Sequence, residues 1–180
     1  IATYGNGLWR LDADGLVSWR ESTGALDSDL LYTMATTRAP DGESVLWVAT
    51  RRGLARIKGD SVQNFSRQHG LPSDVMRNVQ VWRSPDGIDV LWVATEAGVA
   101  RALANASQWH TASLMGARGN GVFGLALEPD GAGGERLWVS ASMDGVGRYQ
   151  QGRWSRYSVE SGDLPNNEAR MLKRALDADG

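Results

Sequence analysis

The sequence contains no cysteine, and this absence excludes disulfide bonds and metal sites built on thiolates. No run approaches the roughly 18 consecutive apolar residues of a membrane-spanning helix, and the opening residues Ile1 to Tyr4 do not follow the signal-peptide pattern. An excess of positive charge is also absent. The 19 basic and 21 acidic side chains leave a net charge of −2, so a nucleic-acid partner is not expected.

Glycine and tryptophan are plentiful, with 22 and 8 residues, and the tryptophans expose an internal repeat. The run Leu-Trp-Val-Ala-Thr at 46–50 returns at 91–95 and, as Leu-Trp-Val-Ser-Ala, at 137–141. Its tryptophans, Trp47, Trp92 and Trp138, are therefore 45 and 46 residues apart. The opening Ile1-Ala2-Thr3 matches the end of the same run. A fixed period of this length indicates a repeat architecture.

Three further runs recur in each repeat. A glycine-initiated run ending in arginine follows the tryptophan run, which predicts a hairpin. A third run carries one aromatic residue, and a fourth leads into a Pro-Asp-Gly turn at 40–42, 85–87 and 129–131. Four short strands per repeat predict an all-β fold, a β-propeller of four-stranded blades with about four repeats of 45–47 residues. A β-sandwich is the structural alternative, although it would not require constant spacing. The third-run aromatics are Trp19, Phe65, Trp109 and Trp154.

The blades are expected to form one propeller segment over residues 1–180. The predicted boundaries are a split blade at 1–22 plus 168–180 and complete blades at 29–68, 74–113 and 121–158, giving sixteen strands. Because the first copy lacks its Leu-Trp, we expect a segment of a larger propeller. Two alternatives remain: a final strand near 170–175 could close on 1–3 to give a four-bladed ring, or two copies could associate into an eight-bladed ring.

One repeat carries a pattern that resembles a known family. It reads Gly-Leu-Pro-Ser-Asp-Val at 70–75, Pro-Asp-Gly at 85–87, Leu-Trp-Val-Ala-Thr at 91–95 and Gly-Val-Ala-Arg at 98–101. This pattern resembles the two-component regulator propeller repeat. The resemblance implies the extracytoplasmic, periplasmic sensing part of a bacterial membrane protein whose output domain is a histidine kinase or a diguanylate cyclase. Contact with a membrane would then come only through the parent protein.

The loops that break the repeat are the candidate ligand site. The turns after the tryptophan runs should gather at one end of the propeller, and packing does not explain why they differ between blades. Their mixture of apolar and charged side chains suits a small molecule, a glycan or a peptide. The alternative is that they are solvated loop tips. The predicted ligand-binding residues are Tyr4, Asn6, Arg51, Arg52, Glu96, Met143 and Asp144.

No catalytic or metal-binding set is recognisable. His69 and His110 have no metal-ligand spacing, and no Ser-His-Asp order, paired carboxylates or phosphate-binding glycine loop can be assembled. We therefore expect a non-catalytic protein with no metal and no cofactor. The favoured function is a ligand-sensing propeller segment. A protein-interaction scaffold is the alternative, a propeller lyase is less favoured, and self-association of the segment is possible.

Overall fold

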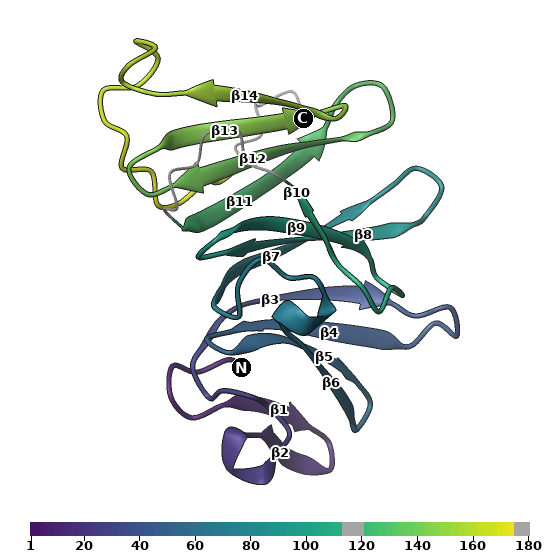
Figure 1. Ribbon diagram of the computed structural model, residues 1–180. Coiled ribbons are helices and arrows are strands. Elements are labelled where there is room, and N and C mark those ends of the chain that lie inside the picture. Colours follow the sequence, from purple (N-terminus) through teal and green to yellow (C-terminus); the bar gives the residue numbers. More distant parts are fainter. Residues whose placement is uncertain (113–120, 175–180) are drawn as a thin grey trace.

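The computed structural model describes residues 1–112 and 121–174, which form antiparallel sheets that follow one another in chain order (Figure 1). The first sheet has two strands and the other three have four each. Two short 3-10 helices, η1 (Glu21–Thr23) and η2 (Arg67–His69), lie in connections between sheets. The strands are β1 (Leu8–Asp12) and β2 (Gly15–Trp19); β3 (Leu31–Arg38), β4 (Ser44–Thr50), β5 (Gly53–Lys58) and β6 (Ser61–Phe65); β7 (Met76–Arg83), β8 (Asp89–Thr95), β9 (Gly98–Leu103) and β10 (His110–Ala112); β11 (Val122–Pro129), β12 (Glu135–Ala141), β13 (Gly145–Gln150) and β14 (Arg153–Tyr157).

The architecture confirms the all-β prediction of four-stranded propeller blades, but the strand count differs. Residues 1–3 form only an isolated bridge, Ala2 to Leu8, and the described residues 169–174 form no strand. This last stretch runs beside β11, where Arg170 O and Leu172 N lie 3.2 and 3.1 Å from the position a Cβ on Gly124 would take. The expected sixteen strands are therefore fourteen in the described part. Within the described residues no bridge joins these two end stretches to each other, so the ladder that both were expected to share is not formed.

The predicted blade bounds reach beyond the described residues at two places. These are residue 113, the end of the blade at 74–113, and residues 175–180, the end of the split blade.

The tryptophans of β4 and β8 fill the interfaces between sheets. Trp47 and Trp92 are fully buried. The Trp47 ring centroid lies 5.8 Å from that of Phe65 in its own sheet and 6.1 Å from that of Trp109 in the next. Trp92 meets Tyr149 of the following sheet at 5.3 Å. Each tryptophan thus joins two blades, as the once-per-repeat occurrence predicts, and aromatic burial of this kind dominates core energetics.

Trp138, the equivalent residue of β12, is only partly buried. Its ring contacts Tyr157 at 5.5 Å within the same sheet, and its Nε1 donates to Glu128 Oε1 at 2.9 Å. An open pocket of about 360 Å³ borders it, closed on one side by residues 172–174. The same residue type therefore contributes less burial at this position than at Trp47 or Trp92.

Asp89 clamps the second and third sheets together. Its carboxylate accepts hydrogen bonds from Arg83 Nε and Nη2 at 2.8 and 3.0 Å, and from the backbone N of Arg38 on β3 at 3.2 Å. The bond to the Arg83 guanidinium lowers the pKa of Asp89 below its ordinary value, burial opposes this shift, and the Arg38 amide reinforces it.

The lowered pKa predicts that Asp89 makes the protein acid-sensitive. The unfolded chain binds the proton at a higher pH than the folded one, so the contribution is present at neutral pH and is lost as the pH falls below about 4. The denaturant midpoint of Asp89→Asn should therefore fall less between pH 6 and pH 3 than that of the wild type. Asp86→Asn, in the exposed adjoining turn, is the control and should follow the wild type. Parallel curves for wild type and Asp89→Asn would contradict this assignment.

Candidate ligand-binding site

The turns between the second and third strands of each sheet lie beside the beginnings of the first strands. Arg51 N donates to Leu30 O at 3.0 Å, Glu96 N to Val75 O at 3.1 Å and Ser142 N to Gly121 O at 3.2 Å. The same contact in three sheets gathers these turns at one end of the molecule, together with the start of β3, β7 and β11. The arrangement predicted for the candidate site is thus present.

Each of these first strands carries an irregularity at the same place. The pairing register shifts between Leu31 and Thr33, between Met76 and Asn78, and between Val122 and Gly124. The residue left out of each register is Tyr32, Arg77 or Phe123. A β-bulge of this kind redirects the side chain of its extra residue, and bulges are over-represented next to functional sites.

The three bulge residues and Tyr4 form a continuous line and, together with Glu96 beside Arg77, are here called the aromatic–arginine row. The rings of Tyr4 and Tyr32 meet edge to face with centroids 6.1 Å apart. The Arg77 guanidinium carbon lies 5.1 Å from the Tyr32 centroid and 5.3 Å from that of Phe123. The cation is therefore placed between two rings from neighbouring sheets, an arrangement that each ring face favours electrostatically.

Glu96 supplies the negative charge of the row. Its Oε1 accepts a hydrogen bond from Arg77 Nη2, while Arg77 Nε is buried and has no acceptor among the described residues. The Glu96 side chain remains 45% exposed and Tyr4 is 72% exposed. The row thus places ring surfaces, a guanidinium and a carboxylate side by side. This combination can pack against apolar groups and bond to hydroxyls or amides.

Of the predicted residues, Tyr4 and Glu96 belong to the row, whereas the arginines lie beside it. Arg52 Nη1 is 2.7 Å from Glu21 Oε1, near η1, and this exposed pair is worth little to stability. Arg51 is exposed, and its backbone anchors the turn as described above.

A threonine shapes the turns that carry the predicted residues. Thr50 Oγ1 donates to Gly53 O at 2.9 Å and accepts from Arg52 N at 3.1 Å, and Thr95 repeats this pair with Gly98 and Ala97. Before β1, Thr3 Oγ1 likewise donates to Gly7 O and accepts from Asn6 N. The backbone O of Asn6 accepts a hydrogen bond from Trp9 Nε1 at 2.9 Å.

The fourth sheet lacks this threonine, because Ala141 occupies the equivalent position. Its turn contains three residues, 142–144, and Met143 adopts a left-handed φ of 65° with its side chain 64% exposed. A left-handed conformation is uncommon for a residue other than glycine. Met143 therefore projects into solvent from a turn that differs in shape from the others.

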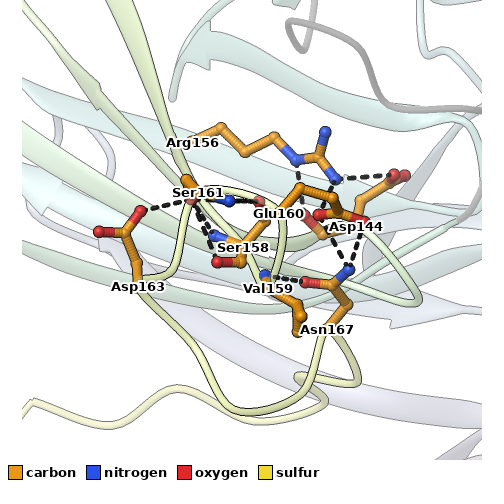
Figure 2. A network of polar contacts seen from close by, with 8 residues as sticks. All are labelled: Asp144, Arg156, Ser158, Val159, Glu160, Ser161, Asp163 and Asn167. Atoms are coloured by element: carbon orange, nitrogen blue, oxygen red, sulfur yellow. Dashed lines mark hydrogen bonds and ion pairs between the residues drawn. The ribbon is translucent and has the colours of Figure 1, made fainter.

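Asp144 occupies a different environment, a polar network that ties the last loop to the fourth sheet (Figure 2). Asp144 is 8% exposed; Arg156 Nε donates to its backbone O at 2.9 Å, and Arg156 Nη2 lies 3.7 Å from its Oδ1. Arg156 Nη2 also lies 3.5 Å from Glu160 Oε2. Asn167 continues the network: it accepts Val159 N at 2.8 Å and donates to Glu160. The carboxylate of Asp144 is thus engaged in holding the loop.

Sequence reasoning missed Tyr32, Arg77 and Phe123. They occupy one position of the repeat, 45 and 46 residues apart. The residue type at this position changes from blade to blade, as it does in the turns from which the candidate site was predicted. The bulge that brings them together is not visible in the sequence, because it leaves the apolar pattern of each strand intact.

Other kinds of site were also sought in residues 1–112 and 121–174. In these ranges no group of three or more His, Cys, Asp or Glu side chains could hold a metal ion. Within the same part of the chain, no helix is long and apolar enough to span a membrane.

The fold is similar to solved extracellular domains of bacterial signalling proteins. One belongs to a protein assigned as a hybrid two component system, BT3049 of B. thetaiotaomicron, with 22% identity, a TM-score of 0.63, and 94% of this chain and 21% of that chain covered. Two structures of BT4673 from the same organism, assigned once as a one component and once as a hybrid two component system, are 20% identical, with TM-scores of 0.63 and 0.62 and coverage of 93% and 22%.

This likeness establishes the fold. The chain spans about a fifth of the length of these domains. No protein-family model matches the chain, and neither does any curated protein sequence. The two-component regulator propeller repeat therefore stays an inference from the motifs.

Proposed function

We propose that this chain is a non-catalytic, ligand-sensing β-propeller segment in the extracytoplasmic part of a bacterial membrane signalling receptor, and that the aromatic–arginine row binds the ligand. The sensor-domain likeness and the repeat motifs support the receptor role. The observation that carries the binding role is the placement of Arg77 between Tyr32 and Phe123, beside a half-exposed Glu96. Three neighbouring blades contribute to this arrangement: Arg77 and Glu96 come from the middle blade, and Tyr32 and Phe123 from the blades on either side.

The chemistry of the row favours a glycan or a short peptide. Ring faces pack against the apolar face of a sugar or against a peptide side chain, while Arg77 and Glu96 can donate to and accept from hydroxyls or amides. Charges of both signs in one row favour a ligand that is polar but close to neutral.

A binding panel tests this proposal. The full 180-residue chain is titrated calorimetrically with neutral oligosaccharides and with short peptides, and at least one class should bind saturably. Loss of one stacking ring, in Tyr32→Ala or Phe123→Ala, should weaken that binding about three- to tenfold, since an aromatic contact contributes roughly 0.5–1.5 kcal/mol. Leu16→Ala removes an exposed apolar side chain of β2, away from the row, and should bind like the wild type.

Other results of these titrations would contradict the proposal or favour the alternative function. Absence of saturable binding across the panel, with folded protein confirmed by circular dichroism, would contradict ligand sensing by the row. Equal loss of affinity in Leu16→Ala and in the row variants would mean that the effect is general rather than local. If neither class bound and the chain instead bound tightly only to another folded protein, the scaffold alternative would be favoured.

A further inference from the structure

A groove between the second and third sheets contains three arginines. It lies at the end opposite the row, where the turns between β3 and β4, β7 and β8, and β9 and β10 meet. Two adjoining hollows of about 420 and 370 Å³ share Arg38, Arg83 and Asp89, and the larger one also reaches Arg56. These four side chains are the charged groups of its lining, so three positive charges face one negative charge.

Arg56 belongs to a feature that recurs in every complete blade. Its guanidinium carbon lies 5.8 Å from the centroid of Trp47, and Arg101 and Arg148 lie 5.7 Å from Trp92 and Trp138. In the third sheet this arginine also has an acidic partner: Arg101 Nη2 lies 2.9 Å from Glu135 Oε1 of the following sheet. A ring-stacked arginine paired with a carboxylate across the interface is thus one solution that the fold uses.

The equivalent carboxylate for Arg56 is Asp89, because Asp89 precedes Trp92 by three residues as Glu135 precedes Trp138. Arg83 takes this carboxylate. It lies opposite Asp89 in the strand register and binds it through two nitrogens, whereas the residue opposite Glu135 is Pro129, which has no side-chain donor. An arginine rather than a proline at this position of the repeat therefore binds the carboxylate of Asp89, which would otherwise be the partner of Arg56.

Arg56 is left without a carboxylate. Among the described residues, its guanidinium has no hydrogen-bonding or ion-pair partner, and its Nε is buried and unpaired. A guanidinium without an acidic partner can gain charge-assisted hydrogen bonds from a bound anion. Arg56 lines the groove together with Arg38 and Arg83.

We propose that this groove is an anion site, in which Arg56 binds an oxyanion, a carboxylate or a phosphate or sulfate group, with Arg38 and Arg83 adding positive charge. Guanidinium groups bind such oxyanions through paired, charge-assisted hydrogen bonds. The site is separate from the aromatic–arginine row and does not depend on the function proposed for that row.

The test uses inorganic phosphate, sulfate and glucuronate at constant ionic strength, with chloride as the reference anion. Side-chain Nε–Hε resonances of the arginines are followed by NMR in the 180-residue chain. The Arg56 resonance should shift saturably, and the affinity should fall about tenfold or more in Arg56→Gln, since hydrogen bonds to charged groups are worth roughly 1.5–3 kcal/mol. Arg153→Gln is the matched control, because it removes one exposed positive charge on β14 and should leave the affinity unchanged.

A second variant provides a change of opposite sign. Asp89→Asn removes the negative charge of the groove and should tighten anion binding. Because a misfolded variant would lose affinity, a gain shows that the local charge sets the affinity. Preference for glucuronate over phosphate and sulfate would assign the site to carboxylates, and the reverse order to tetrahedral anions. The proposal is overturned if no anion binds saturably up to ~10 mM, a concentration that corresponds to very weak binding, or if Arg56→Gln binds as tightly as Arg153→Gln.

Discussion

Trp92→Ala should lower the free energy of unfolding by about 3–5 kcal/mol, the range for truncating a buried large aromatic side chain. Trp92 is fully buried: its ring contacts Tyr149 of the next sheet and lies under the guanidinium of Arg101. Its Nε1 has no hydrogen-bond partner in the described chain, so the expected loss comes from packing alone. Urea denaturation, with the slope checked for two-state behaviour, measures the change.

Two controls separate burial from residue type. Trp138→Ala removes the same side chain where one face is open and should cost less, about 1–3 kcal/mol. Arg51→Ala changes an exposed turn and should stay within about 0.5 kcal/mol. If Trp92→Ala cost no more than Trp138→Ala, the interfaces between blades would not be the main source of stability.

Gly53→Ala should be the second large effect, a loss of about 3 kcal/mol. Gly53 begins β5 with a φ of 126°, a region that residues with a Cβ rarely adopt. A Cβ there would also stand 2.5 Å from the carbonyl oxygen of Phe65 on β6. The backbone of β5 or β6 would have to move, because the atom in the way belongs to the main chain.

Gly15→Ala is the matched control. Gly15 begins β2 with a φ of 125°, nearly the same as that of Gly53, but a Cβ at that position meets no atom within 4 Å. It should cost only the conformational term, about 1–2 kcal/mol. Thermal unfolding of both variants gives the comparison, and equal losses at the two glycines would show that the close approach to Phe65 is not limiting.

The fold could be predicted because its determinants are local and repeated. The apolar runs, the glycines and Trp47 and Trp92 recur at constant spacing, and each repeat solves the same packing problem. The strands at the two ends were overestimated because pairing depends on a neighbour, and the sequence of residues 1–3 does not tell whether one is present.

The candidate site was only partly predictable. The position of the turns follows from the hairpin pattern, so Tyr4 and Glu96 could be placed at this end of the molecule. Tyr32, Arg77 and Phe123 were missed because a one-residue bulge changes which way a side chain points while the apolar pattern stays the same.

Asp144 and Arg56 illustrate a second limit. Both depend on the choice of an ionic partner from another strand. Arg156, the partner of Asp144, is twelve residues away, and Asp89 prefers Arg83 to Arg56 because of the residue opposite it in the ladder. Spacing along the chain cannot decide between such competing partners.

The most direct test of ligand sensing by the row is to map where the ligand binds. The 180-residue chain, labelled with ¹⁵N, is titrated with the tightest-binding neutral oligosaccharide or peptide, and amide and arginine Nε shifts are recorded. The account predicts the largest shifts at Tyr32, Arg77, Glu96 and Phe123, and their loss in Arg77→Gln. Shifts confined to other parts of the molecule, or undiminished binding by Arg77→Gln, would contradict it.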